Sequence, residues 1–186
     1  LVIVAVPVLL IVKQPDYGTA ITFVIATIFI LFVAGIKKRY IITGILLVAI
    51  LLPVLYLFVL PEHAKTRIDV FLNPNLDPRG DGYNIIQSKL AIGAGQIFGM
   101  GLFKGNQTQL GYLYPKTTDF IFAVIGEELG FAGCMAVIIL LSAIVIECII
   151  TAVRAKNFAG RLICCGVAAY ISFQAFINLG VVTQIL

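Results

Sequence analysis

The hydrophobic residues of this chain gather in five blocks that are separated by polar segments. The blocks cover residues 1–12, 19–36, 40–60, 129–153 and 162–186. A helix needs about 20 mostly apolar residues to cross a bilayer, so the last four blocks predict transmembrane helices. The first block is too short to span, and the last has no polar flank. We therefore expect a fragment that begins and ends inside such helices.

The composition is that of a membrane protein. Of the 186 residues, 61% are hydrophobic and 12% are charged, and the mean hydropathy is +1.08, whereas a soluble domain is about 45–50% apolar and about 25% charged. This excludes a soluble globular domain and a disordered chain. The net charge of +4 is not gathered in a basic run, which argues against a nucleic-acid partner. We expect an all-α fold, a polytopic α-helical membrane protein with residues 1–186 as a single membrane domain.

The positions of the cationic residues predict which loops face the cytoplasm. Short cytoplasmic loops retain Lys and Arg. Residues 37–39 join the second and third blocks, and Arg154, Lys156 and Arg161 flank the link between the fourth and fifth. Both turns are therefore expected on the cytoplasmic side, which makes the long segment 61–118 an extracytoplasmic loop.

This long loop contains an amphipathic stretch. Structureless loops of such length are uncommon unless they are functional or disordered. Tyr83, Ile86 and Leu90 recur at i, i+3 and i+7, which is the spacing of one helix face. The stretch predicts either a helix lying in the membrane interface or a helix packed on the spans, and the sequence leaves both open.

Glycines follow this stretch at short intervals, at positions 93, 95, 99, 101 and 105. No strand precedes them, so they do not match a dinucleotide-binding fingerprint. Glycine lets the backbone adopt positive φ and approach a ligand closely, and Lys89, Lys104 and Lys116 are near enough in sequence to neutralise an anion. The alternative is that the glycines only turn the loop back toward the membrane.

Asp119 is the most unusual polar residue, because it stands between Thr118 and Phe120 at the start of an apolar stretch. A charged carboxylate that enters the apolar region is costly, by about 2.5–3.5 kcal/mol on insertion scales. It is either an acid at a helix N-terminus, favoured by the helix dipole, or a general base. The residues alone do not decide between the two.

Glu127 and Glu128 follow eight and nine residues after Asp119. A continuous helix would carry them about 12–13 Å deeper at 1.5 Å per residue. We therefore expect the stretch to re-enter or to break at Gly126, beside a polar cavity open to the outer face, because irregular backbone at membrane depth must line protein or water. Gln174 and Asn178 are expected to form hydrogen bonds between helices.

The side chains that bind metals do not form a recognisable site. Cys134, Cys148, Cys164 and Cys165 lie in apolar stretches without CxxC spacing, and His63 has no second type of ligand nearby. We expect neither a zinc site nor a disulfide framework, and we assign no metal ligand.

Several motifs, in order, resemble the SEDS family of bacterial cell-wall proteins (RodA/FtsW/SpoVE). They are KQPDYGTA (13–20), FLNPNLDPRGDGYNIIQSKLAIGAG (71–95), GMGLFKGNQTQLGYL (99–113) and TDFIFAVIGEELGF (118–131). The sequences at residues 83–89 and 107–110 are more similar to the RodA type than to the FtsW type. The resemblance covers nearly the whole chain.

This resemblance implies a ten-helix membrane glycosyltransferase that polymerises lipid II into peptidoglycan strands and releases undecaprenyl diphosphate, for cell elongation and shape. The chain would supply about five of the ten helices and the large extracytoplasmic loop, without the first spans and the last helix. The implied location is the bacterial plasma membrane, and the implied partner is a class B penicillin-binding protein transpeptidase.

The resemblance also implies roles for individual residues. The essential acid of the family corresponds to Asp119, which would deprotonate the 4-hydroxyl of the acceptor's GlcNAc. Lys104 and Lys116 are our own candidates for binding the diphosphate. The other substrate-binding candidates are Gln107, Thr118, Gln87 and Lys89. The family also implies a divalent cation, Mg²⁺ or Mn²⁺.

One departure concerns residues 113–117, which lack the Glu and His that family members often carry there.

Two functions of other classes remain as alternatives. One is a transporter of the lipid-linked precursor, because polar residues within the spans could line a pathway. The other is a noncatalytic scaffold of the wall-synthesis complex.

Overall fold

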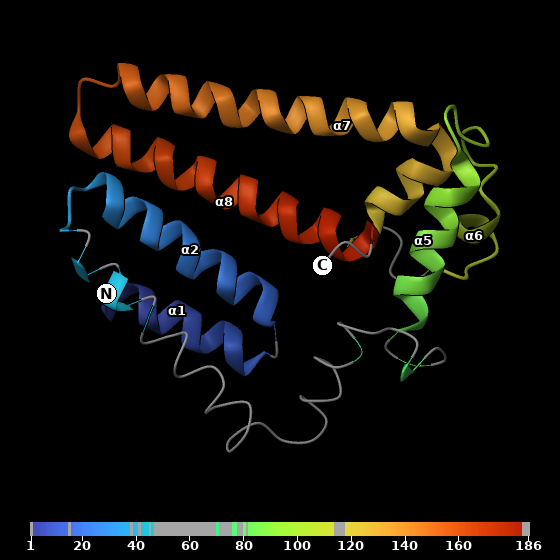
Figure 1. Cartoon of the computed structure of the whole chain (residues 1–186), viewed down its shortest axis with the longest axis horizontal. Coiled ribbons are helices and arrows are strands. Elements are labelled where there is room, and N and C mark those ends of the chain that lie inside the picture. Colours follow the sequence, from blue (N-terminus) through green and yellow to red (C-terminus); the bar gives the residue numbers. More distant parts are fainter. Residues whose placement is uncertain are drawn as a thin grey trace. The chain divides into compact units, whose positions relative to one another are not determined.

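The computed structural model describes residues 2–14, 16–37, 39–40, 42–44, 46, 70, 76–77, 80, 82–113 and 118–183, and the regular elements in these segments are helices. The helices are α1 (Val2–Lys13), α2 (Tyr17–Val33), α5 (Tyr83–Gly95), α6 (Asn106–Gln109), α7 (Ile121–Arg154) and α8 (Phe158–Thr183) (Figure 1). No strand occurs in these segments. The all-α prediction is confirmed.

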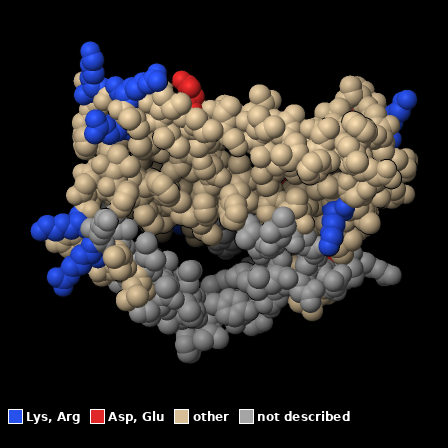
Figure 2. Space-filling model, turned by 45° about the horizontal axis from the view of Figure 1, so that its top comes forward, with Lys and Arg blue, Asp and Glu red and all other residues tan. Residues whose placement is uncertain are grey.

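Helices α7 and α8 are long and apolar enough to cross a membrane. They contain 34 and 26 residues, against the roughly 20 that a bilayer requires. Helices α1 and α2 are shorter and also apolar. The expected span 40–60 lies mostly outside the described residues. On the face shown in Figure 2, uncharged side chains make up most of the described surface, as expected where lipid is the solvent.

The helices belong to two compact units. The first comprises residues 1–54 and 140–176. In it, Asp16 caps α2 by accepting a hydrogen bond from Thr19 N at 3.1 Å. The buried hydroxyl of Thr22 on α2 lies 3.1 Å from Oε1 of Gln174 on α8. The expected interhelical hydrogen bond of Gln174 is therefore confirmed.

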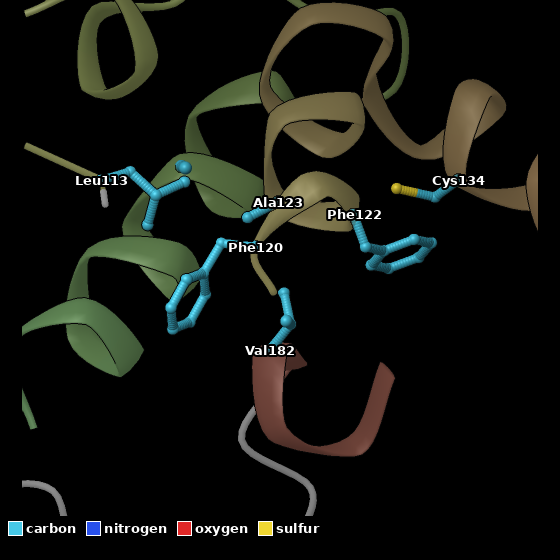
Figure 3. Packing of buried hydrophobic residues seen from close by; sticks show 7 residues of the cluster. Leu113, Phe120, Phe122, Ala123, Cys134 and Val182 are labelled. Carbon is cyan, nitrogen blue, oxygen red and sulfur yellow. The ribbon is translucent and has the colours of Figure 1, made fainter. Parts of the chain in front are cut away.

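The second unit comprises residues 55–139 and 177–186. Its core joins α5, the loop that follows, the first turns of α7 and the end of α8 (Figure 3). The buried side chains of this core are those of Ala91, Leu113, Phe120, Phe122, Ala123, Cys134 and Val182. This cluster positions the residues at the start of α7.

Helix α5 packs in this unit through small side chains. Its buried residues are Ile85, Ser88, Ala91 and Gly95, whereas Leu90 is 52% exposed. The expected apolar face of Tyr83, Ile86 and Leu90 is therefore not the one that is buried. The small residues allow close approach: Ser88 Oγ donates to the carbonyl oxygen of Val182 at 3.0 Å, and a Cβ on Gly95 would lie 2.8 Å from the carbonyl carbon of Gly126. These contacts support the hypothesis of a helix packed on the spans.

Helix α7 is broken at Gly130, which has φ 66° and ψ −163°. The break separates a short segment, residues 121–129, from a long segment, residues 131–154. In a continuous helix, the N–H groups of Phe131 and Ala132 would donate to the residues four positions earlier. Here they donate to Gln96 O at 2.8 Å and Ile97 O at 3.0 Å in the glycine-containing loop.

The carbonyl groups that this break releases find partners in the same loop. Met100 N donates to Glu127 O at 2.9 Å, and Gly101 N donates to Glu128 O at 3.0 Å. Two helical hydrogen bonds are thus replaced by four bonds to the loop. The break leaves none of these four groups unpaired, which matters because an unpaired buried peptide group is strongly unfavourable.

The expected break at Gly126 was wrong by four residues. Gly126 stays helical and serves close packing, because a Cβ there would lie 2.9 Å from Cγ1 of Ile92 on α5. Of Gly126 and Gly130, it is Gly130 that has a positive φ, in a region of backbone geometry that is essentially restricted to glycine. The choice between the two glycines depends on where the loop docks.

We predict that Gly130→Ala destabilises the protein, by about 1–3 kcal/mol from backbone strain. An added Cβ would also lie 2.6 Å from the carbonyl carbon of Ile97. The measurement is the thermal unfolding midpoint in detergent. Gly93→Ala is the matched control, since Gly93 is helical and its Cβ would meet nothing within 4 Å. Equal midpoints for the two variants would contradict the prediction.

Candidate functional site

Asp119 lies in the turn that leads into α7, and its side chain is exposed. The backbone around it is anchored from two sides. Asn178 Nδ2 on α8 donates to the carbonyl oxygen of Asp119 at 2.9 Å, and the next residue, Phe120, belongs to the buried core. The result is a carboxylate that is open to solvent on a backbone that is held in place.

The contacts at the start of α7 bear on the two hypotheses for this acid. The helix begins at Ile121, two residues after Asp119. The N–H groups of Ala123 and Val124 donate to the carbonyl oxygen of Phe120, at 3.0 and 3.3 Å. Phe120 is therefore the residue directly before the helix, and Asp119 stands one position earlier than an N-cap residue.

Glu127 is completely buried, and its carboxylate is bound by the loop that precedes α7 in the sequence. Gln107 N donates to Oε1 at 2.7 Å, and Thr108 N donates to Oε2 at 3.0 Å. The hydroxyl of Thr108 also donates to Oε2. Hydrogen bonds to a charged acceptor are among the stronger ones in proteins, so three of them offset the desolvation of this carboxylate.

The same contact replaces the missing cap of helix α6. Gly105 is the N-cap residue and has no side chain to accept a hydrogen bond. Side chains at this position usually bind the N–H groups of the second and third helical residues, which here are Gln107 and Thr108. Glu127 binds both. A side chain at position 105 would collide with it, since a Cβ on Gly105 would lie 2.6 Å from the carboxyl carbon.

The glycines of this loop serve contact with α7. Gly99 and Gly101 have φ values of 79° and 100°. A Cβ on Gly99 would lie 2.6 Å from the backbone nitrogen of Leu129. The sequence analysis offered two interpretations, a close approach to a ligand or a turn back toward the membrane. The structure shows a close approach, and its partner is the protein's own helix α7. Sequence reasoning had singled out these glycines but could not identify their partner.

The predicted cationic residues are distributed over two elements and an undescribed segment. Lys104 is exposed in the glycine-containing loop, where its backbone N donates to Gly101 O at 3.1 Å. Lys89 is exposed on α5. Lys116 lies outside the described residues, so its predicted role is untested.

The predicted polar residues differ in their surroundings. Thr118 is exposed and directly precedes Asp119. Gln87 is partly buried on α5. Gln107 is held through its backbone by Glu127, and its own side-chain oxygen is buried without a hydrogen-bond partner. The sequence shows that Glu127 would lie unusually deep along a continuous helix, but it does not show that this residue holds the loop.

The described side chains bear on the implied divalent cation. Within the described segments, no three His, Cys, Asp or Glu side chains form a group that could hold a metal ion. Asp119 therefore has no ready set of co-ligands there, and the chemistry of this site is best derived from the chain's own residues.

Comparison with known proteins identifies relatives of the entire chain. A family model for FtsW, RodA and SpoVE, described as "Cell cycle protein", matches residues 1–186. "Peptidoglycan glycosyltransferase MrdB" of Escherichia coli is 39% identical over 186 residues, which are 100% of this chain and 50% of that protein. "Probable peptidoglycan glycosyltransferase FtsW" of Trichlorobacter lovleyi is 44% identical over 174 residues, 94% of this chain and 45% of that protein.

A solved structure shares the fold. Its description is "Structural coordination of polymerization and crosslinking by a peptidoglycan synthase complex", and the similarity has a TM-score of 0.76 at 26% sequence identity. It covers 95% of this chain and 48% of the matched chain. The chain therefore spans about half the length of the proteins that it matches.

We predict that Glu127→Gln loosens the loop at residues 105–109. The amide of Gln offers one acceptor oxygen in place of two, and its NH₂ group faces N–H donors. The substitution therefore loses a hydrogen bond to a charged acceptor, which contributes about 1.5–3 kcal/mol to stability. Hydrogen exchange of the amides of Gln107 and Thr108 should accelerate. Glu147→Gln, at an exposed glutamate of the same helix, is the control. Unchanged protection of both amides would refute the capping role.

Proposed function

Because the chain belongs to the FtsW/RodA/SpoVE (SEDS) family, we propose that the protein is a peptidoglycan glycosyltransferase that polymerises lipid II. The single observation that carries the proposal is the exposed Asp119 carboxylate on an anchored backbone. The names of both relatives support the reaction class. The similarity to the RodA type favours a role in cell elongation and shape.

Asp119 acts as the general base in this proposal. Its carboxylate takes the proton of the GlcNAc 4-hydroxyl of the acceptor as that oxygen attacks the anomeric carbon of the donor's MurNAc. The new C–O bond forms as the bond to the diphosphate breaks, and undecaprenyl diphosphate leaves with the electron pair. One base and one stabilised leaving group suffice for such an inverting displacement. Exposure gives an acceptor sugar access to the carboxylate, and the anchors at Asn178 and Phe120 limit its movement.

The leaving diphosphate requires positive charge. Lys104 is our first candidate because its side chain is exposed in a loop that is bonded to the short segment of α7, which begins two residues after Asp119. Lys116 is the second candidate. Gln107, Thr118, Gln87 and Lys89 are proposed to bind other polar groups of the substrate. A divalent cation, Mg²⁺ or Mn²⁺, would supply further charge at the diphosphate.

Family membership also supports a proposed location and a proposed partner. We place the protein in the bacterial plasma membrane with residues 61–118 outside the cytoplasm, where lipid-linked sugars are polymerised. The proposed partner is a class B penicillin-binding protein transpeptidase. The description of the similar structure, which names polymerization and crosslinking in one complex, supports an association of this kind.

We predict that Asp119→Asn abolishes polymerisation. The amide keeps the size of the side chain but cannot accept the proton, so the rate should fall by about 10²–10⁴-fold. The measurement is glycan-chain formation from purified lipid II by the full-length protein. Glu147→Gln, which makes the same acid-to-amide change at an exposed site, should retain activity.

Three outcomes distinguish the alternatives. Unchanged polymer from Asp119→Asn removes this residue as the base. Movement of labelled lipid II across vesicles without polymer favours a transporter. If the unsubstituted protein, with its partner present, forms no polymer and moves no lipid II, the result favours a scaffold.

We also predict that Lys104→Ala lowers the kcat/KM for lipid II by about 10-fold, equivalent to roughly 1.4 kcal/mol. Loss of the ammonium group removes charge stabilisation from the leaving diphosphate. Lys156→Ala, at an exposed lysine between α7 and α8, should leave the value unchanged. An unaltered kcat/KM for Lys104→Ala would eliminate this lysine as a diphosphate ligand.

A further inference from the structure

The tip of the glycine-containing loop, residues 97–103, displays large apolar side chains that pack against little else. Ile97 and Leu102 are each 61% exposed, Phe98 is 82% exposed and Phe103 is 80% exposed. Single exposed hydrophobic residues are common, but a contiguous group of this size usually marks an interaction surface. We call this group the apolar tip.

The backbone holds the apolar tip in an unfavourable conformation. Gln96 and Phe103, which stand at its two ends, have φ values of 50° and 60°. Such values are rare for residues other than glycine, and strained positions of this kind cluster at functional segments. The exposed side chains are therefore presented by a defined loop structure.

The apolar tip adjoins the apolar surface of a predicted membrane span. The carbonyl oxygens of Ile97 and of the preceding Gln96 accept hydrogen bonds from Ala132 N and Phe131 N, at the start of the long segment of α7. Phe131 and, two turns later, Ile139 are also well exposed. Helix α7 is long and apolar enough to cross a membrane, and in an apolar window of 18 residues within it only 6% are buried. The surface beside the tip is therefore apolar and exposed, as a lipid-facing surface is.

Irregular backbone can lie at membrane depth only where its polar groups are satisfied by protein or by water. This condition is met where the loop docks, because the hydrogen bonds between residues 96–101 and 127–132 pair the groups that the break in α7 would otherwise leave open. Lys104 and the polar helix α6 (Asn106–Gln109) follow the tip directly. Lysine beside an apolar segment suits the interface, where its stem is buried and its ammonium group stays in water.

We propose that the apolar tip is inserted into the bilayer, where acyl chains of membrane lipids cover Ile97, Phe98, Leu102 and Phe103. The insertion holds the loop that carries Lys104 at the membrane surface. Continuity with the lipid-facing surface of α7 selects bilayer lipid as the occupant. The inference does not depend on the proposed reaction, because it rests on exposed apolar surface and backbone pairing alone.

The test uses tryptophan fluorescence in the full-length protein in lipid vesicles. The chain contains no Trp, so Phe98→Trp and Phe103→Trp each place one reporter in the tip, with any tryptophan elsewhere in the protein replaced by Phe. Phosphatidylcholine brominated on its acyl chains reports contact with lipid, and aqueous iodide reports contact with water. Ile139→Trp is the lipid-exposed control, and Gln109→Trp, on the exposed polar surface of α6, is the water-exposed control.

The expected result is at least a two-fold loss of fluorescence at positions 98 and 103 in brominated lipid, as at position 139, with little quenching by iodide. Quenching by iodide alone, as at position 109, would place the tip in water and overturn the proposal. Protection from both quenchers would mean that protein covers the tip and would equally overturn it. The two independent positions keep the test decisive if one variant fails to fold. Glycan synthesis is not part of the readout, so failure here is distinct from failure of the proposed reaction.

Discussion

The break in helix α7 depends on the hydrogen bonds that a distant loop supplies. A membrane helix satisfies its own peptide groups, and an interruption requires other partners. At Gly130 these partners are residues 96–101, which accept from the N–H groups of Phe131 and Ala132 and donate to the carbonyl groups released four positions earlier. The loop and the short segment of α7 therefore form one structural element. The close approach of Gly95 and Gly99 and the buried Glu127 both depend on this docking.

Asp119 and Glu127, which lie before and within the short segment, show how the start of one helix separates structure from chemistry. Glu127 is buried, and its charge is shared among three donors from the loop. Asp119, eight residues earlier, is exposed, and only its carbonyl group is anchored, by Asn178. A carboxylate surrounded by donors is already engaged, whereas a solvated one on a fixed backbone can accept a proton from a bound hydroxyl. The local environment therefore supports a reactive Asp119 and a structural Glu127.

The loop connects the proposed chemistry with the membrane. Its glycines dock on α7, its apolar tip lies beside the outer surface of the long segment, and Lys104 follows at the edge of that tip. A lipid-linked sugar presents its diphosphate at the boundary between acyl chains and water. A cation whose position is tied to both the membrane surface and the start of α7 suits such a substrate. Family membership supports the proposed reaction class, and the chain spans about half of its relatives' length.

The amino-acid sequence by itself determined that the chain is helical and apolar, that Asp119 is an unusual acid, and that the family is SEDS, because block length, composition and contiguous motifs are local properties. Only the tertiary structure decided that α5 buries Ser88 and Ala91 in place of Leu90, that α7 breaks at Gly130 in place of Gly126, and that Glu127 caps α6. Each of these outcomes depends on which backbone comes close enough to accept or donate a hydrogen bond. Such partners lie some 20 to 90 residues apart, and local periodicity carries no information about them.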